Sequence, residues 1–258
     1  MENSISKTTI CNNFSRNAHS YDDNNDVQNE AARMLIKRLP VRKPGTILEI
    51  GCGTGNYTQL LRDAFRKSRI EAIDISDAMI KLAEKKLSDG NTVFWTADAE
   101  TAEFNRKFDL VTSNAVFHWL GDLESMSGKL KDLIKEDGAV TFSIFGPKTF
   151  LELKKSIMAV AGKDVPMTAD NFYDKEKIGL IFRKHFKDVR VTERIMTETY
   201  PSLTDLLRKV KYSGTRGRGA GLGKLWSPGF IKKIENKYME CFGTVEATYQ
   251  IFFCEAFR

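Results

Sequence analysis

Three glycines, each separated by one residue, directly follow a short apolar segment at 46–50, which ends Leu-Glu-Ile. They are Gly51, Gly53 and Gly55. Residues without a Cβ let the backbone turn sharply at the end of a strand and come close to a ligand. An acid, Asp74, ends the next apolar segment about 20 residues on, where a carboxylate can bind ribose hydroxyls. The spacing therefore predicts a site for a ligand that contains adenosine.

The loop lacks the features of a phosphate site. No Lys-Ser or Lys-Thr pair follows Gly55, and the spacing is G-x-G-x-G rather than the G-x-G-x-x-G of a dinucleotide site. The predicted ligand therefore needs no pyrophosphate cradle. Taken alone, the glycines are also compatible with an ordinary tight turn between a strand and a helix, so the prediction depends on the acids that follow them.

Apolar segments alternate with helical ones from residue 46 onward. This alternation predicts parallel strand–helix–strand units with helices covering both faces of the sheet. Strands are expected at 46–50, 70–75, 92–96, 108–113, 138–145, 189–197 and 247–257. Helices are expected at 27–39, 56–66, 77–87 and 123–135. Ser76 is well suited to cap the helix that follows it.

The ordered segments LEIGCGTG, AIDIS, ADAE and FDLVTSNAVFHW resemble the motifs of class I S-adenosylmethionine-dependent methyltransferases over roughly residues 46–146. The resemblance implies that the cofactor is S-adenosylmethionine. It also implies an α/β fold with a Rossmann-like, seven-stranded and mostly parallel sheet, in which one strand near the carboxyl terminus is reversed. It also implies three parts: an N-terminal helical lid (1–44), a cofactor-binding core (45–147), and a remainder (148–258). The remainder would complete the sheet and insert a basic helical cap before the last strand.

The matching positions imply a set of cofactor-binding residues. Glu49 and Gly51 are expected near the methionine part, and Asp74 at the ribose. The other expected contacts are Gly53 and Gly55 in the loop, Ile75 and Met79 at the adenine, Asp98 at the adenine amino group with Ala99 beside it, Asn114, Trp119, and Tyr21 from the lid.

Both ends of the chain resemble one methyltransferase family. Three segments are similar to segments of the malonyl-acyl-carrier-protein O-methyltransferases of biotin synthesis. They are NFSRNAHSY at 13–21 followed by Val27-Gln28, LLRKVKYSG at 206–214, and TYQIFF at 248–253. The chain departs from that family at His118, where Gln is common. The resemblance implies methylation of the free carboxylate of a malonyl thioester on acyl carrier protein, giving the methyl ester that primes pimelate and biotin synthesis.

A carboxylate acceptor needs little acid–base chemistry. With a pKa near 4 it is already ionised at neutral pH, so the enzyme has to align its oxygen with the methyl group and exclude water. Tyr21 is the first candidate, because the lid can fold over the cofactor, and its alternative role is packing. His118 is a candidate base, although its place beside Trp119 favours packing. The candidates to hold the acyl carboxylate or the partner are Arg208, Lys209, Lys211 and Arg216.

Positive charge is concentrated in one segment. The 258 residues carry a net charge of +6 at pH 7, and residues 202–237 contain nine Lys or Arg against two acids. A local basic surface indicates an acidic partner at one place, and acyl carrier protein fits this description. A solubilising surface is the alternative interpretation. The glycine-rich run at 214–223 is expected to be a mobile loop.

The sequence also argues against several classes of protein. It has no apolar run long enough to span a bilayer, and the polar first 20 residues have no apolar core of the kind a signal peptide needs, so we expect a cytoplasmic protein with no membrane partner. The four cysteines lie far apart, without metal-ligand spacing, so neither a metal site nor a disulfide framework is predicted.

Two other functions stay open. One is methylation of a small free carboxylate, or of a quinone or phenol. A phenol would have to be deprotonated, so a base such as His118 would then be essential. The other is nucleic-acid binding through the Arg-Gly run at 216–219. No Asn-Pro-Pro-Tyr-type tetrapeptide, which would hold a flipped base, follows the fourth expected strand, and interleaved aromatic and basic residues are absent. No nucleic-acid partner is therefore expected.

Overall fold

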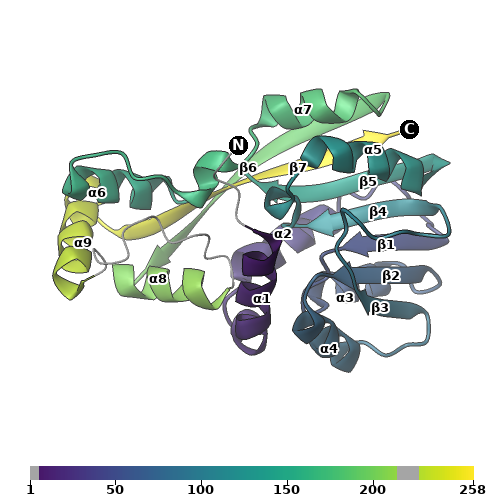
Figure 1. Cartoon of the computed structure of the whole chain (residues 1–258), viewed down its shortest axis with the longest axis horizontal. Helices are drawn as coiled ribbons and strands as arrows, with labels where there is room; N and C mark the ends of the chain where they lie inside the picture. The colour runs from purple at the N-terminus through teal and green to yellow at the C-terminus, as the bar shows by residue number, and fades with distance from the viewer. Residues whose placement is uncertain (1–5, 214–226) are drawn as a thin grey trace.

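The computed structural model describes residues 6–213 and 227–258. Its centre is a seven-stranded sheet of order β3-β2-β1-β4-β5-β7-β6 (Figure 1). The strands are β1 (Thr46–Ile50), β2 (Arg69–Asp74), β3 (Thr92–Thr96), β4 (Phe108–Asn114), β5 (Ile134–Phe145), β6 (Asp188–Tyr200) and β7 (Val245–Phe257). The first five strands are parallel, and β7 is antiparallel to both of its neighbours. The predicted Rossmann-like fold with a reversed last strand is confirmed.

Helices cover both faces of the sheet. They are α1 (Lys7–Tyr21), α2 (Asp26–Ile36), α3 (Asn56–Ala64), α4 (Asp77–Lys86), α5 (Leu123–Leu133), α6 (Leu151–Ala161), α7 (Lys175–Arg183), α8 (Leu203–Tyr212) and α9 (Pro228–Phe242). The buried side chains of α2, α3 and α4 form one core cluster with strand residues, and those of α5 and α7 form a second. Two separate cores are expected where a parallel sheet is buried on both faces.

Strands β6 and β7 extend past the parallel strands. Residues 139–145 of β5 pair with 251–257 of β7, whereas β6 pairs with β7 over its whole length. The end of β7 nearest Val245 therefore lies beyond β5. Helices α6, α8 and α9 gather around this extension, and α1 lies between it and the parallel strands (Figure 1). Residues of the predicted basic cap thus form α8 and α9.

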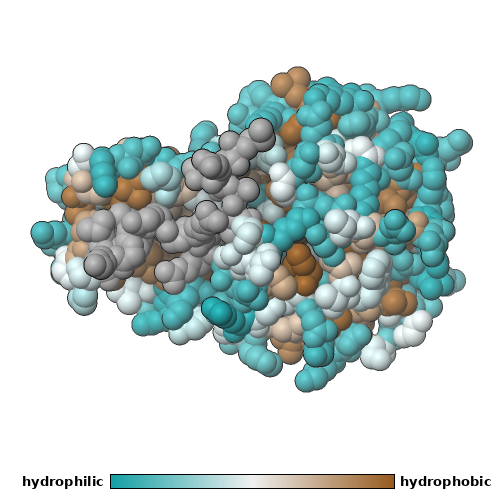
Figure 2. Space-filling view, in the orientation of Figure 1, coloured by the Kyte–Doolittle hydropathy of each residue, from teal (hydrophilic) through white to brown (hydrophobic). Residues whose placement is uncertain are grey.

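The N-terminal helices contact the cofactor half of the sheet. α2 packs on α3, and α1 contacts α4 and α8. The predicted cap of α4 is confirmed, since the Ser76 hydroxyl accepts from the Met79 amide, and Ser15 of α1 hydrogen-bonds to the same hydroxyl. The face of the molecule shown in Figure 2 is mainly hydrophilic, with apolar side chains in small patches. No helix of the described residues has the length and apolar character to cross a membrane.

The sequence misplaces two boundaries near β5. The predicted helix 123–135 ends at Leu133, and the strand predicted at 138–145 starts at Ile134. Ile134 pairs with Phe108, and the register then shifts before regular pairing resumes at Ala139. The charged, exposed residues 135–137 lie in this irregular stretch, so they show no strand pattern.

Candidate functional site

The glycine loop is shaped by a close contact with the segment after β4. Gly51 has φ +72, and a Cβ placed there would lie 2.3 Å from Val116 Cγ2, so no other residue fits without displacing Val116. The amides of Gly51 and Cys52 both donate to the Ile73 carbonyl, at 2.7 and 2.9 Å. The loop is therefore held between β2 and the β4 end, with its backbone at the carboxyl edge of the sheet.

Asp74 connects the glycine loop to the start of α4. Its Oδ2 accepts from the Gly53 amide at 2.9 Å and its Oδ1 from the Ser76 amide at 2.8 Å. Burial raises the pKa of this carboxyl, while the two amides act to lower it. Each oxygen keeps a second lone pair, so the carboxylate can accept two hydroxyl groups side by side, as ribose chelation requires.

One cavity collects most of the predicted cofactor residues. Besides Asp74, it is lined by Tyr21, Gly51, Gly53, Ile75, Met79, Asp98, Ala99, Asn114 and Trp119. Two predicted residues do not line it. Gly55 has φ +84 and precedes α3, where a Cβ would lie 3.2 Å from Ala83 of α4, so its role is in helix packing. Glu49 lies beneath the loop and is only 1% exposed.

Glu49 is a buried carboxyl with an unpaired oxygen. Its Oε2 has no hydrogen-bond partner among the described residues. Burial, together with the charge of nearby Asp74, raises its pKa to about 8. An uncompensated buried acid is costly unless a cation or donor approaches it. The ammonium group of a methionine moiety would be such a partner, and this position is where the sequence placed it.

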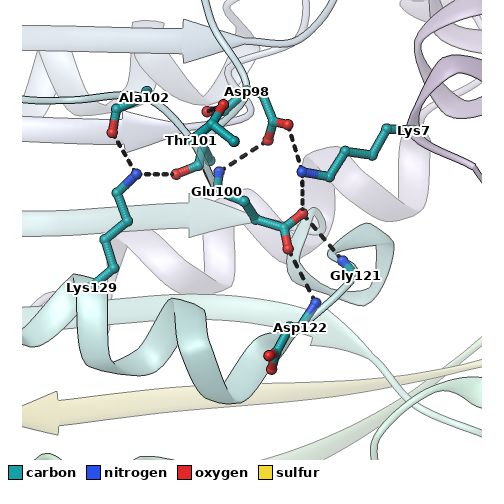
Figure 3. A network of polar contacts seen from close by, with 9 residues as sticks. Lys7, Asp98, Glu100, Thr101, Ala102, Gly121, Asp122 and Lys129 are labelled. Carbon is teal, nitrogen blue, oxygen red and sulfur yellow. Dashed lines mark hydrogen bonds and ion pairs between the residues drawn. The ribbon is translucent and has the colours of Figure 1, made fainter.

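Helix α1 is joined by a polar network to the part of the cavity wall that contains Asp98 (Figure 3). Lys7 Nζ lies 2.5 Å from Asp98 Oδ2 and 2.8 Å from Glu100 Oε2. Glu100 also accepts from the backbone amides of Gly121 and Asp122, at 3.2 and 3.1 Å. Helix α1, the segment after β3 and the start of α5 therefore meet at one carboxylate.

The lid has a second anchor beside the glycine loop. Asp22 Oδ1 accepts from the Thr54 hydroxyl at 2.5 Å and from Asn56 at 3.0 Å, and Asp22 Oδ2 lies 2.7 Å from Lys86 Nζ. Burial acts to raise the pKa of Asp22, but the contacts with Lys86, Thr54 and Asn56 outweigh it and lower the pKa. The turn between α1 and α2 is thus held over the loop by an ionised acid.

Tyr21 ends α1 above the cofactor loop. Its ring lies 3.9 Å from the position that a Cβ of Gly53 would take, and it meets Phe14 edge-on. Burial and the charges of Asp74 and Asp22 raise the pKa of its hydroxyl. Tyr21 therefore stays a neutral phenol at physiological pH, able to donate a hydrogen bond but not to act as a base.

A second cavity of about 450 Å³ adjoins the first. Most of its wall is apolar, with side chains from α6, α8, α9 and β7; the main contributors are Phe145, Phe150, Leu153, Ile157, Leu207, Ile231 and Tyr249. His118 and Trp119 form its boundary toward the sheet. An apolar cavity of this volume with few polar groups has the usual form of a substrate site.

His118 lies in an aromatic environment. Its ring centroid is 4.8 Å from that of Phe172 and 5.1 Å from that of Phe145, and its Nδ1 is buried with no hydrogen-bond partner among the described residues. Burial lowers its pKa to about 3. An imidazole with this pKa is a weak base, so the geometry does not favour its use to deprotonate a phenol.

The predicted cations differ in their surroundings. Lys209 lies 2.6 Å from Asp26 and 3.1 Å from Glu198, which ties α8 to α2 and β6. Arg208 is exposed and pairs with Asp205. All three line the second cavity, and they differ in that Lys211, which stands 5.2 Å from the Tyr212 ring, has no carboxylate partner among the described residues. Arg216 and the expected loop at 214–223 lie outside the described residues.

Comparison with known proteins places the chain in a family. Residues 48–140 match the family model described as a methyltransferase domain. The malonyl-[acyl-carrier protein] O-methyltransferase of Anoxybacillus flavithermus is 33% identical over 99% of both chains, and that of Bacillus cereus is 31% identical over 96% of both. The chain belongs to the malonyl-[acyl-carrier protein] O-methyltransferase family. It is an S-adenosylmethionine-dependent methyltransferase, as the loop and its acids predict.

Solved structures share the fold of this methyltransferase. YcgJ of Bacillus subtilis superposes with a TM-score of 0.62 at 15% identity, over 89% of this chain and 98% of that one. Phosphoethanolamine N-methyltransferase 2 of Haemonchus contortus, in complex with S-adenosyl-L-methionine, gives a TM-score of 0.56 at 18% identity, over 88% of this chain and 52% of that one. These identities are too low to carry more than the fold.

The residues fit the cofactor, and several residues of the cavity wall were not among those predicted from the sequence. The paired acceptors of Asp74 on the cavity wall suit the ribose, and the unpaired oxygen of Glu49, beneath the loop, suits the ammonium group. Lys7 and Gln28 also line this cavity. Lys7 gives no local signal, because a Lys on a polar helix is an ordinary surface residue until the fold places it, whereas Gln28 stood in the family-like segment without an assigned role.

Proposed function

We propose that this methyltransferase methylates the free carboxylate of a malonyl thioester carried by acyl carrier protein, yielding a methyl ester that primes pimelate formation for biotin. The full-length relatives named for this activity support the proposal. The observation that carries it is the arrangement of two adjoining cavities, one holding the cofactor residues and one apolar with Lys211 on its wall.

The chemistry requires alignment rather than a base. When bound, S-adenosylmethionine supplies an electrophilic methyl on a sulfonium sulfur; a carboxylate oxygen takes it as the carbon–sulfur bond breaks with its electron pair left on sulfur, and no proton moves. The lid, anchored at Lys7 and Asp22, covers the site and excludes water. The absence of any required proton transfer agrees with a neutral Tyr21 and a weakly basic His118.

The carrier is proposed to dock on α8 and α9. Exposed cations on these helices include Arg208, Lys211, Lys232 and Lys233. Of these, Arg208 and Lys232 pair with Asp205 and Glu235, and Lys233 has no ion-pair partner among the described residues. A basic surface beside the mouth of an acyl cavity would steer an acidic carrier protein, and would do so less at high salt.

Methyl transfer from labelled S-adenosylmethionine tests the proposal. Purified malonyl- and acetyl-acyl carrier protein are supplied in parallel, and base-labile label is expected on the malonyl form only. Label on neither carrier, with S-adenosylhomocysteine still bound, would retain the fold and cofactor and reject this acceptor. Small free carboxylates would then be tried first, since the phenol alternative needs a base and the pKa of His118 is lowered to about 3.

A further inference from the structure

The two cavities meet at two side chains. Of the described residues, only Gln28 and Trp119 line both the cofactor cavity and the apolar cavity. A methyl group that passes from cofactor to acceptor must cross this boundary. The polar groups of these two residues are therefore candidates to contact the reacting carboxylate.

Gln28 is fixed through its backbone. It lies in the first turn of α2, and its carbonyl accepts from Asn114 Nδ2 at 3.0 Å. Asn114 is itself held at the end of β4, where its Oδ1 accepts from the Ser143 hydroxyl at 2.7 Å. The side-chain amide of Gln28 makes no hydrogen bond to any other described residue, so its two N–H donors are available at the boundary.

Trp119 is fixed through its ring. It meets Phe14 of α1 edge-on at 6.1 Å and Phe172 edge-on at 6.1 Å, between ring centroids. The backbone that carries it leaves β4 through Ala115 at φ +56, a conformation that non-glycine residues rarely adopt. In the part of the chain that is described, its indole N–H has no hydrogen-bond acceptor. An indole nitrogen donates only, so this group suits an anionic oxygen.

Neutral donors match the charge change in this reaction. The acceptor starts as a carboxylate and ends as an uncharged ester, so its negative charge diminishes toward the transition state. A cation in direct contact would stabilise the starting carboxylate more than the transition state and would slow the step. Amide and indole N–H groups orient the oxygen while stabilising the starting carboxylate less than a cation would. Lys211 lines only the acyl cavity, so it can attract the anion without lying at the boundary.

We infer that the Gln28 amide and the Trp119 indole N–H bind the acceptor carboxylate and orient one of its oxygens toward the cofactor cavity. This inference rests on the proposed function, because it assigns a place to the carboxylate of that acceptor. Two parts of the protein then bind two parts of the substrate. Gln28 and Trp119 bind the carboxylate at the point of transfer, and the cap binds the carrier protein.

Equilibrium binding to the enzyme saturated with S-adenosylhomocysteine provides a test without turnover. Affinities for malonyl- and acetyl-acyl carrier protein are compared in the wild type, Gln28→Ala, Gln28→Glu and Trp119→Phe. Loss of a hydrogen bond to a charged group predicts that the malonyl-over-acetyl preference falls about 10-fold or more in Gln28→Ala and Trp119→Phe. Gln28→Glu should lose it further, because it places a negative charge against the carboxylate. Affinity for S-adenosylhomocysteine is measured in parallel, because both residues also line the cofactor cavity, and the malonyl-over-acetyl ratio is taken on enzyme saturated with it so that a change in cofactor affinity does not affect the comparison.

Turnover and a matched variant complete the experiment. The same exchange at Gln59→Glu, on α3 beside Asp63, should leave preference and turnover at wild-type values. A wild type with no malonyl preference would overturn the proposed function and this inference together. A wild-type preference that persists in all three variants would overturn the inference alone. Equal weakening of malonyl and acetyl carriers would also overturn it, since a purely structural role affects both.

Discussion

Lys7 Nζ lies 2.5 Å from Oδ2 of Asp98, the residue expected to bind the adenine amino group (Figure 3). The same ammonium contacts Glu100, so α1 is attached to the rim of the cofactor cavity by one side chain shared between two acids. Lys7 and Asp98 both line that cavity. Cofactor exchange should therefore be coupled to the position of the lid.

Replacing Lys7 should speed cofactor exchange. A partly exposed ion pair contributes up to about 1 kcal/mol, so Lys7→Met should raise the dissociation rate of S-adenosylhomocysteine by up to about fivefold. Added salt should raise the rate in the wild type and have little effect in the variant. Stopped-flow displacement measures both. Lys81→Met is the matched control, since Lys81 pairs with Asp77 on the exposed side of α4. Equal rates and equal salt dependence in wild type and Lys7→Met would contradict the prediction.

Asp74→Asn should weaken cofactor binding more strongly. The amide replaces one accepting oxygen with a donor that faces the Gly53 or Ser76 N–H, and it removes the charge that is expected to bind the ribose. Hydrogen bonds to charged groups are worth about 1.5–3 kcal/mol, so the affinity for S-adenosylhomocysteine should fall about 10- to 100-fold in calorimetry. The melting temperature without ligand should also fall, because the loop loses an anchor. Unchanged affinity would mean that the ribose lies elsewhere.

The strands could be predicted where their burial gives the sequence a regular pattern of apolar residues. The first four predicted strands lie within one or two residues of the observed ones, because each is a short apolar run bounded by a glycine or polar turn. Helix α1 has no such signal: only Ile10 and Ala18 are buried, and it is held by polar contacts such as those of Lys7 and Ser15. The length of β6 was underestimated because its exposed edge carries charged residues.

The candidate site divides in the same way. Residues fixed by local geometry, such as Gly51 and Asp74, could be predicted, since a tight turn and a strand end constrain the residue type. The contacts between side chains and backbone groups of distant segments could not be predicted. Gln28 is placed by Asn114, 86 positions away, and Lys209 is paired with Asp26, 183 positions away. The positive charge of Lys209 is thus balanced by Asp26, which lies too far away in the sequence for a local count of charges to include it.

Glu49 should make stability depend on pH. Its pKa is raised from 4.5 to about 8 in the folded protein, so between these values the unfolded carboxyl is ionised while the folded one is protonated. The free energy of unfolding should therefore fall as pH rises from about 4.5 to 8. Glu49→Gln removes this loss, so its melting temperature should exceed that of the wild type by a few degrees, roughly 2–5 °C, at pH 8 and by little at pH 5.

Scanning calorimetry of the ligand-free protein measures this difference. Glu84→Gln on the exposed side of α4 is the control and should follow the wild type at every pH. A Glu49→Gln melting temperature that falls below the wild type at pH 8 would show that the carboxylate is ionised and paired in the folded state.

His118 should be dispensable for proton transfer. Because burial lowers its pKa to about 3, its protonation does not change between pH 6 and 8, and kcat should be independent of pH over that range. His118→Gln keeps a polar side chain and should retain turnover within about threefold, which is the scale of one neutral hydrogen bond or less. Steady-state kinetics with malonyl-acyl carrier protein decide the matter. A 100-fold loss of kcat in a folded variant, together with a wild-type kcat that depends on pH, would show that His118 acts as a general base.

Two exposed lysines of the cap, Lys211 and Lys233, should differ in what they recognise. Lys233 lies on α9 and does not line the acyl cavity, whereas Lys211 lines it. Lys233→Glu should raise KM for malonyl-acyl carrier protein about 3- to 10-fold, mainly through slower association, and leave KM for malonyl-pantetheine unchanged. Lys211→Glu should raise KM for both acceptors, because it places a negative charge beside the acyl group itself.

Ionic strength separates docking from cavity effects. Raising salt should increase the wild-type KM for the carrier substrate and reduce its difference from Lys233→Glu, since exposed charges are screened within about 10 Å at 0.1 M. Lys67→Glu, an exposed lysine between α3 and β2 at the amino end of the strands, is the matched control and should leave both KM values unchanged. If Lys233→Glu matched the wild type with both acceptors at low salt, the carrier would dock away from α9, and the positive surface there would serve solubility.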